Sequence, residues 1–363
     1  DFDLNSISFN ELFAEVKAYI QPMLQDLRPF ESNGTSNSDW YLLAPILLDI
    51  QQERADHVEQ WLDIIENSAS ELFDGEERQK ARKGRLAHIS RLRDYIDQGE
   101  LLQLGPIPAD LIEVLSYSLI ANPALCAQRS ISGLWLNGNN ERNIAEYTYR
   151  FAELTTKFFN HEYAKPIVNR NIRVELLVGN NKSPAWFKVL TYCSHGNFQS
   201  MLDEFCHLLA TSGHNLNLAY EKLSSSMGIR SAGEHVQFRE DVLKPNKENS
   251  HIRCHFAVSM GTQKINDDNG LQRVVNVRDA FNSPFRPFVL SSTSIGQEGL
   301  DFHWYCRRVV HWNLPNNPID IEQREGRVNR FKSYVVRKRL AEVTHVKNNY
   351  GTDIWEDIFE QAI

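Results

Sequence analysis

The sequence predicts a large, mostly α-helical domain followed by an α/β domain built on a parallel sheet. Two observations support this prediction. Through about residue 225, apolar residues recur at the three- and four-residue spacing of amphipathic helices. Beyond a small polar stretch at 224–228, short β-type runs alternate with loops and a short helical segment, as in parallel-sheet proteins. We therefore expect a helical domain over 1–228, with room for two helical subdomains, an α/β domain over 229–345 and a C-terminal helix within 346–363.

Composition and charge leave a broad range of functions open. The 363 residues suffice for more than one domain with a sizeable core. The net charge of −8 neither favours nor excludes a nucleic-acid partner, because local basic patches supply phosphate contacts. The five cysteines are dispersed and form no Cys-x-x-Cys pair, which argues for reduced thiols and against a structural zinc site.

The chain carries no signal that would direct it to a membrane. It begins at Asp1, without an initiator methionine or an apolar leader, so we expect a piece of a longer protein. No apolar run approaches the roughly 20 residues of a membrane-spanning helix, so we expect no membrane partner. Together with the reduced cysteines, these features predict a cytoplasmic location.

The first 225 residues contain a series of predicted helices. Helical spacing of apolar residues covers about 6–30, 39–72, 110–122, 140–164 and 186–210. Loops rich in Ser, Asn, Gly or Pro lie at 31–39 and 104–110. Asp110 is placed to cap the helix that follows it. The segment 172–179 alternates briefly between polar and apolar residues and suggests a strand.

The charged segment from Glu76 to Arg93 has two interpretations. Its basic residues are Arg78, Lys80, Arg82, Lys83, Arg85, Arg91 and Arg93. They form either a phosphate-contacting face or a solvated helix face with pairs such as Glu76 and Lys80. We favour the solvated face, because no aromatic side chains are interleaved to stack on bases. Whether the helical domain binds duplex nucleic acid or a partner protein stays open.

Segments with β-type composition begin after residue 228. They are residues 235–238, 255–259, 288–291 and 308–311. A polar loop over 261–270 and a short helix over 274–281 lie between them, and a tail helix is expected at 352–359. This alternation is the basis for the predicted parallel sheet.

One stretch at the end of a predicted strand is suited to a phosphate. The apolar run 288–290 breaks into small polar residues and a Gly-x-x-Gly turn, from Gly296 to Gly299. A buried parallel strand can open in this way into a loop whose backbone N–H groups approach an anion.

A second stretch carries a regular series of arginines. Pro318 is a good first-turn residue for a helix. The following residues place Arg324, Arg327 and Arg330 at intervals of three, so we expect them to cluster along one side of that helix. A row of guanidinium groups is suited to a polyanion or to a phosphoryl group in transfer.

Both stretches resemble motifs of superfamily 2 helicases and translocases. Residues 292–301, Ser-Thr-Ser-Ile-Gly-Gln-Glu-Gly-Leu-Asp, look like motif V, and residues 323–330, Gln-Arg-Glu-Gly-Arg-Val-Asn-Arg, look like motif VI. The intervening 308–318 resembles the Swi/Snf-like branch, including the bacterial RNA-polymerase-recycling ATPase and large phage-defence-type helicases. The resemblance covers about 281–340. It implies a bacterial protein whose α/β domain is the second, C-terminal RecA-like helicase domain.

The resemblance implies an ATP site. Arg327 and Arg330 match the arginine fingers of motif VI, which neutralise charge on the γ-phosphate during phosphoryl transfer. Gln323 would orient the nucleotide or couple it to the nucleic-acid site, and Arg324 matches the family pattern too. Gly299 and Asp301 would lie at the cofactor. Asp301 would bond a ribose hydroxyl or bridge toward motif VI, and its alternative is an ordinary helix-cap or loop aspartate.

The resemblance also implies contacts with nucleic acid. Ser292 and Thr293 would contact the nucleic-acid backbone, and Gly296 would allow its close approach, so binding should be largely independent of base sequence. Glu298 would repel a phosphate unless it pairs with an arginine such as Arg324. Swi/Snf-like relatives translocate on duplex DNA, so duplex DNA is the expected partner.

A group of histidines and tryptophans lies between the two motifs. His303, Trp304, His311 and Trp312 could form a stacking or metal-binding cluster, but such residues are more often core and loop residues around a β-sheet. We favour the interpretation as core and loop residues and expect no metal site.

Parts of the family pattern are missing from the sequence. It contains no Gly-x-x-x-x-Gly-Lys-Ser/Thr, the P-loop that cradles phosphates. Its one Asp-Glu pair, Asp203-Glu204, lies in a helical pattern and not at the end of a strand, where it would hold Mg²⁺. ATP and Mg²⁺ would be held mainly by an absent first RecA-like domain, a required partner, and this chain alone would be inactive. The alternative is a non-catalytic helicase-like scaffold that binds nucleic acid or partner proteins.

Overall fold

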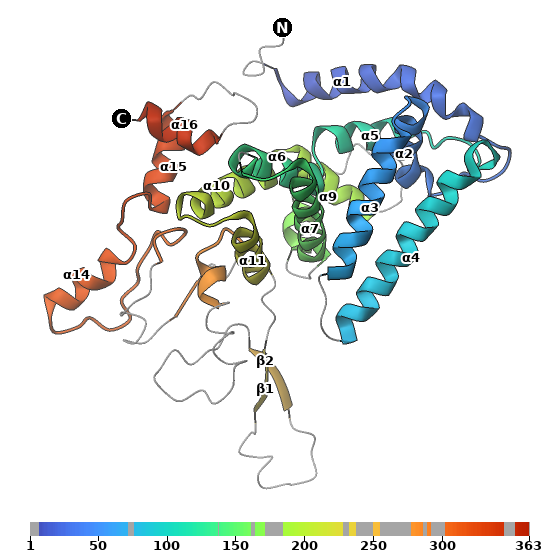
Figure 1. The fold of residues 1–363 in the computed structure, drawn as a ribbon. Coiled ribbons are helices and arrows are strands. Elements are labelled where there is room, and N and C mark those ends of the chain that lie inside the picture. Colours follow the sequence, from blue (N-terminus) through green and yellow to red (C-terminus); the bar gives the residue numbers. More distant parts are fainter. Residues whose placement is uncertain are drawn as a thin grey trace. The chain divides into compact units, whose positions relative to one another are not determined.

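In the computed structural model, the chain forms two compact units (Figure 1). It describes residues 7–71, 76–136, 138–160, 164–170, 184–227, 232–236, 250–254, 277–285, 289–291, 302–344 and 353–362. Unit 1 comprises Asp1–Ala210 and Lys347–Asp353, and unit 2 comprises Thr211–Val346 and Ile354–Ile363. The predicted domain boundary at residue 228 stays a prediction. In the described part of the chain, no helix is both long enough and apolar enough to span a membrane.

Unit 1 is a set of helices. They are α1 (Phe9–Ile20), η1 (Gln21–Phe30), α2 (Trp40–Gln51), α3 (Ala55–Glu71), α4 (Glu76–Gln98), η2 (Gly99–Leu101), α5 (Leu111–Ile120), α6 (Pro123–Trp135), α7 (Glu141–Asn160), α8 (Lys165–Arg170), α9 (Ala185–Ser194) and α10 (Asn197–Thr211), whose last residue belongs to unit 2. The predicted strand at 172–179 lies outside the described residues.

Three predicted helices are interrupted for local reasons. The one expected over 186–210 is divided into α9 and α10 at Gly196, whose φ of 78° is left-handed. The segment expected as one helix over 6–30 begins with a capping box between Ser8 and Glu11, but it changes to the 3₁₀ helix η1 after Ile20. Pro22 and Pro29 lack the backbone N–H that a regular α-helix requires, which explains the change. The segment expected over 39–72 is divided into α2 and α3 at Glu53, whose φ of 61° is left-handed.

The core of unit 1 surrounds α2. Trp40, Leu43 and Leu62 are fully buried there. The Trp40 indole Nε1 donates to the carbonyl oxygen of Gly105 at 3.3 Å, and the Gly105 N–H donates to Ser32 Oγ at 2.9 Å. These hydrogen bonds satisfy polar groups that would otherwise be buried without partners. The loop before α2 is therefore fixed against the segment before α5.

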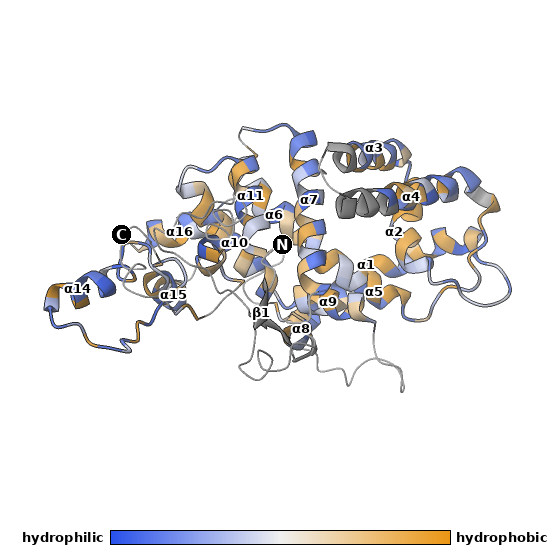
Figure 2. Ribbon diagram, turned by 90° about the horizontal axis from the view of Figure 1, so that it is seen from below, coloured by the Kyte–Doolittle hydropathy of each residue, from blue (hydrophilic) through white to orange (hydrophobic). Residues whose placement is uncertain are grey.

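Helix α7 carries one buried face along its length. Ile144, Phe151 and Phe158 recur at intervals of seven residues and are buried. Hydrophilic residues lie between them, so hydrophobic and hydrophilic positions alternate along the helix (Figure 2). The helix packs against α6 and α3. This amphipathic pattern is why the sequence located α7 to within a few residues.

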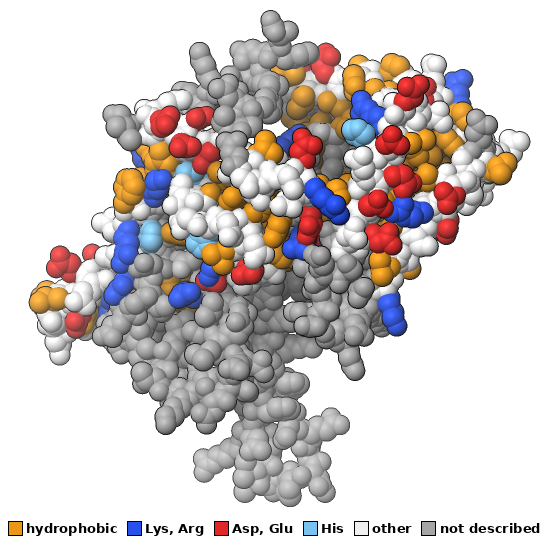
Figure 3. Space-filling model, viewed as in Figure 1, with side chains coloured by type: hydrophobic (Ala, Val, Ile, Leu, Met, Phe, Trp, Pro, Cys, Tyr) orange, Lys and Arg blue, Asp and Glu red, His pale blue; other side chains and the backbone are white. Residues whose placement is uncertain are grey.

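Helices α3 and α4 are joined by ion pairs. The Arg93 guanidinium contacts the carboxylates of Asp63 at 2.7 Å and Glu66 at 3.3 Å, and it also pairs with Glu59. Acidic and basic side chains lie side by side on this part of the surface (Figure 3). Because Arg93 is already committed to three carboxylates, it favours the interpretation of α4 as a paired, solvated helix.

Arg91 is also paired within unit 1. Its Nη2 lies 2.5 Å from Asp39 Oδ2, which also accepts a hydrogen bond from the Tyr95 hydroxyl at 2.6 Å. Burial alone would raise the pKa of Asp39, but the hydrogen bonds from Tyr95 and Arg91 outweigh it and lower the pKa. The side chains of Arg78, Lys80, Arg82 and Arg85 lie outside the described residues.

Asp110 has a role other than the predicted helix cap. It precedes α5, but its side chain makes no capping hydrogen bond. Instead its Oδ1 accepts a hydrogen bond from the Tyr41 hydroxyl of α2 at 2.7 Å. Partial burial and this carboxylate raise the pKa of Tyr41 to about 12. The pair therefore links α2 to the start of α5 while the phenol keeps its proton.

We expect the contribution of Tyr41 to stability to disappear at alkaline pH. An unfolded tyrosine loses its proton near pH 10, whereas the folded phenol keeps it to about 12. The stabilisation is therefore fully present below pH 10 and decreases as the pH rises toward 12. Thermal unfolding of wild type and Tyr41→Phe at pH 8 and at several values above 10 measures the difference. A difference in midpoint that stays constant across this range would contradict the assigned hydrogen bond.

A buried polar group lies between α6, α10 and residue 353 of unit 1. Asp203 accepts hydrogen bonds from Ser130 at 2.6 Å and Gln199 at 2.8 Å, and burial raises its pKa. His207 Nδ1 lies 2.5 Å from Asp353 Oδ2. Asp203 thus lies on helix α10, as its sequence pattern indicated, and takes part in internal hydrogen bonding.

Unit 2 contains fewer regular elements among its described residues. They are α11 (Leu216–Met227), β1 (Ala232–Val236), β2 (Ser250–Cys254), a short helix over 277–281, α14 (Pro318–Gly326), α15 (Tyr334–Val343) and α16 (Ile354–Gln361).

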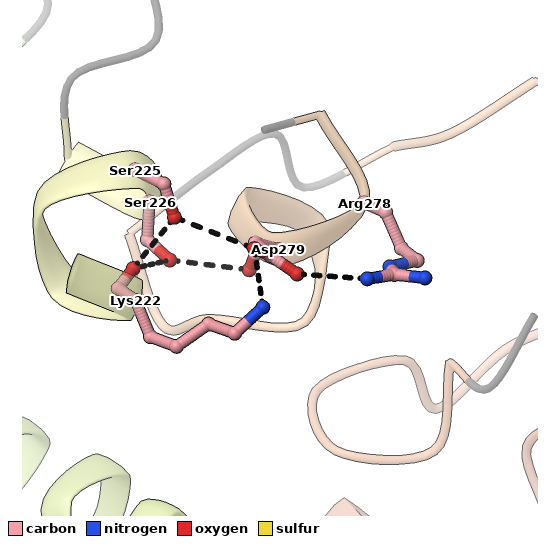
Figure 4. A network of polar contacts seen from close by, with 5 residues as sticks. All are labelled: Lys222, Ser225, Ser226, Arg278 and Asp279. Carbon is pink, nitrogen blue, oxygen red and sulfur yellow. Dashed lines mark hydrogen bonds and ion pairs between the residues drawn. The ribbon is translucent and has the colours of Figure 1, made fainter. Parts of the chain in front are cut away.

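A polar network joins α11 to the short helix at 277–281 (Figure 4). Lys222 Nζ lies 2.8 Å from Asp279 Oδ2, and the Ser226 hydroxyl donates to the Asp279 backbone carbonyl at 3.2 Å. Asp279 also pairs with Arg278 at 3.5 Å and accepts from Ser225 at 3.4 Å. The carboxylate therefore holds two elements that are far apart in sequence.

The predicted parallel-sheet α/β domain is wrong for the part of the chain that the structure describes. Its two strands, β1 and β2, pair antiparallel, with Ala232 opposite Cys254 and Val236 opposite Ser250. The other described elements are helices.

The segments that were expected as strands show why the apolar sequence pattern was misleading. Residues 308–311, expected as a strand, form irregular chain in which the Val310 side chain is 79% exposed. Residues 289–291 are also irregular, and 255–259 lie outside the described residues. A short apolar run indicates a buried strand only if neighbouring strands pair with it, and local sequence does not show whether they do.

Candidate functional site

Helix α14 begins where the sequence indicated. Asn317 is its N-cap, and its Oδ1 accepts a hydrogen bond from the Ile319 N–H at 3.1 Å, while Pro318 occupies the first turn. The helix ends at Gly326, and Arg327 is the C-cap residue. The expected row along one helix face is therefore incomplete, because Arg324 lies on α14 while Arg330 lies in the loop that follows.

The arginines make local contacts with backbone carbonyls. Arg324 Nη1 donates to the Asn313 carbonyl at 3.4 Å, which links α14 to the segment before it. Arg330 Nε donates to the Gly326 carbonyl at 3.3 Å. Gln323 and Arg330 are exposed, whereas Arg324 and Arg327 are half-buried. Arg330 therefore combines an exposed guanidinium with a backbone contact that holds it near the end of α14.

The loop that carries Arg327 and Arg330 is attached to the segment 302–306. The Phe302 N–H donates to the Arg327 carbonyl at 3.4 Å, and the Tyr334 N–H donates to the His303 carbonyl at 2.9 Å. Arg337 on α15 is fully buried. Its guanidinium donates to the backbone carbonyls of Trp304 and Lys332, one in each of the two attached segments. Sequence reasoning missed Arg337, which lies in the basic run 337–339. The local sequence held no signal of its burial, because residues 337–339 have the composition of an exposed basic run.

A groove of about 290 Å³ lies beside this loop. Its lining residues are Arg307, Val309, Glu325, Val328, Asn329, Ser333 and Val335. His311 Nε2 lies 3.9 Å from Glu325 Oε1, which is within ion-pair range but too far for a hydrogen bond. The groove therefore offers both a basic and an acidic side chain next to the loop of Arg327 and Arg330.

Motif V supplies the other predicted site residues. Ser292, Thr293, Gly296, Gly299 and Asp301 all lie outside the described residues, as does Glu298. Their predicted contacts with nucleic acid and cofactor stay predictions.

The histidines and tryptophans between the motifs have different environments. His303 and Trp304 are half-buried, whereas Trp312 lies in irregular chain and is 94% exposed, as expected of a loop residue. Among the described residues, no group of three or more His, Cys, Asp or Glu side chains is arranged to hold a metal ion.

The segment 302–344 differs in charge from the whole chain. It contains nine arginines and lysines and four aspartates and glutamates, a net charge of +5, whereas the whole chain carries −8. A local positive excess of this kind favours an anionic ligand.

Residues 250–332 match the family of the helicase conserved C-terminal domain. Proteins with this domain are typically ATP-dependent helicases. The resemblance to helicases is therefore confirmed at the level of this domain, and the matched segment contains Gln323, Arg324, Arg327 and Arg330. Comparison with curated proteins gave no match, and comparison with solved structures gave none either.

Proposed function

We propose that this chain is the C-terminal part of an ATP-dependent nucleic-acid motor of the superfamily 2 type, resembling the Swi/Snf-like branch. The observation that carries the proposal is the helicase C-terminal domain match at 250–332, which contains the complete sequence Gln323-Arg-Glu-Gly-Arg-Val-Asn-Arg330. The match relates the segment to helicases, and the arginine spacing relates it to the part of a helicase that completes the ATP site.

In this proposal Arg327 and Arg330 are arginine fingers. Their guanidinium groups would stabilise negative charge on the γ-phosphate, which is where electrostatic stabilisation has most effect in phosphoryl transfer. The exposed Arg330 and Gln323 favour contact with a ligand outside this loop. Gln323, Arg324, Gly299 and Asp301 would assist binding of the nucleotide.

ATP and Mg²⁺ require further groups. The sequence contains no P-loop pattern, so we propose that another domain, in the same protein or in a partner, holds the phosphates and the metal ion. The combination of this chain with that P-loop domain is called the assembled motor below. Ser292, Thr293 and Gly296 would contact the nucleic-acid backbone, and duplex DNA is the proposed track. The net charge of +5 over 302–344 supports an anionic track.

The test measures ATP hydrolysis by residues 1–363 alone and by the assembled motor, each with and without duplex DNA. We expect no hydrolysis by the chain alone, because it lacks the P-loop, and DNA-stimulated hydrolysis by the assembled motor. Hydrolysis by the chain alone that Arg327→Ala abolishes would contradict the need for a second domain.

A non-catalytic scaffold is the second candidate. The missing P-loop pattern favours it, whereas the finger spacing of Arg327 and Arg330 does not, because a scaffold needs no guanidinium at those positions. DNA binding without hydrolysis in every combination would support the scaffold and contradict the motor.

A further inference from the structure

Arg337 is a buried cation whose hydrogen bonds are directed at backbone carbonyls. Its side chain is fully buried within unit 2. Nη1 donates to the Lys332 carbonyl at 2.6 Å, Nη2 donates to the Trp304 carbonyl at 2.5 Å, and the guanidinium carbon lies 5.2 Å from the centre of the Tyr305 ring. The contacts combine charge-assisted hydrogen bonds with a cation–π interaction.

A buried arginine needs such partners. Removing a charged group from water is costly unless hydrogen bonds replace the lost hydration, and a guanidinium stays charged because its pKa lies far above neutral pH. An apolar side chain would fill the same space without this cost. The presence of arginine at this position therefore indicates that its N–H groups hold parts of the backbone in place.

The two carbonyls belong to segments with different roles. Trp304 follows the predicted motif V, and Lys332 ends the loop that carries Arg327 and Arg330. Lys332 has a left-handed φ of 57°, a conformation that is unfavourable for a residue with a Cβ and that surrounding contacts must hold. The backbone bonds from Phe302 to Arg327 and from Tyr334 to His303 join the same two segments.

We propose that Arg337 is a positioning residue that fixes the loop 327–332 to the segment 302–305. Its two diverging N–H groups hold both carbonyls at once, so the loop that carries both predicted fingers is tied to the segment that follows the predicted motif V. Lysine has a single compact ammonium group and lacks the rigid fork of donors, so it does not replace arginine at such a site. The consequence for hydrolysis rests on the proposed function, whereas the local order of the loop does not.

Hydrogen exchange of the full 363-residue chain tests the proposal. In Arg337→Met, which keeps length but removes charge and donors, we expect amides in 302–306 and 327–334 to exchange about tenfold faster or more, the factor expected for losing hydrogen bonds to a charged group. Exchange in unit 1 should stay unchanged. Arg337→Lys should show the same local increase. In Arg337→Ala, millimolar guanidinium should restore slow exchange, and methylammonium should not.

The control is Arg339→Met on the same helix, since the Arg339 side chain is 72% exposed. It should leave exchange unchanged. Unchanged exchange in Arg337→Met, or an equal increase across all of unit 2, would overturn the proposal in favour of a passive or a general core role.

Arg337→Met also distinguishes a failure of this proposal from a failure of the proposed function. In the assembled motor, Arg337→Met should lower kcat while KM for ATP changes little, because misplaced fingers affect the transition state. If Arg327→Ala leaves hydrolysis intact, the proposed function fails, and the exchange measurement still decides the role of Arg337.

Discussion

Replacing Arg327 by alanine should lower the rate of ATP hydrolysis by the assembled motor by about 10³-fold or more. This is the effect of removing an arginine finger, which stabilises charge that develops on the transferring phosphoryl group. Arg330→Ala should also lower the rate, because the two guanidinium groups would act on the same charge. Steady-state measurement of kcat and KM for ATP, with saturating duplex DNA, provides the test. We expect the loss in kcat, since a finger acts mainly in the transition state.

Arg339→Ala is the matched control for charge. It removes one positive charge from the same basic segment, but the Arg339 side chain is 72% exposed and pairs with Glu342 on its own helix. Its hydrolysis rate should match wild type. Equal losses in Arg327→Ala and Arg339→Ala would show that net charge, and not a finger, supports the reaction.

Substituting Gly105 by alanine should destabilise unit 1 by about 2–5 kcal/mol, from left-handed strain and overpacking together. Gly105 has a φ of +74°, which favours glycine. A Cβ atom at this position would lie 2.3 Å from the Thr35 carbonyl oxygen and 2.9 Å from its carbonyl carbon. Both atoms belong to the backbone of the loop that Gly105 helps to anchor, so they cannot move aside without displacing Trp40 from its hydrogen bond.

Chemical denaturation followed by tryptophan fluorescence measures this loss. Gly99→Ala is the control, because Gly99 also has a positive φ, of +50°, but no atom lies within 4 Å of its added Cβ. It should show only the cost of the backbone conformation, about 1 kcal/mol. If Gly105→Ala is no less stable than Gly99→Ala, the close packing of the 31–39 loop on residue 105 is wrong.

Periodicity predicted helices best where burial is one-sided. In α7 the spacing of Ile144, Phe151 and Phe158 matches the buried face, so the pattern and the structure agree. It did not show where η1 replaces α1, because the apolar spacing continues across Pro22 although the backbone hydrogen bonding changes. The break at Glu53 was hidden for a related reason, since a single left-handed residue leaves no mark in the apolar pattern.

The candidate site was predictable in part. The start of α14 followed from Pro318, because its preference for the first helical turn depends on the local backbone alone. The parallel sheet did not follow, because strand pairing depends on residues far away in the sequence. Arg337 was missed because a basic residue in a basic run is usually solvent-exposed, and its burial depends on carbonyls that long-range folding brings to it.

The return of the chain to unit 1 at Lys347–Asp353 has a consequence for biosynthesis. Asp353 pairs with His207, a partner 146 residues earlier, so this contact closes only after every residue of 211–346 has been made. A ribosome releases the N-terminal helices early, and domains generally fold in the order of synthesis. The helices of unit 1 can therefore assemble while translation continues. The contact between His207 and the Asp353 carboxylate forms only when the C-terminal segment has left the ribosome. Truncation before residue 347 would leave unit 1 permanently without the contact between His207 and Asp353.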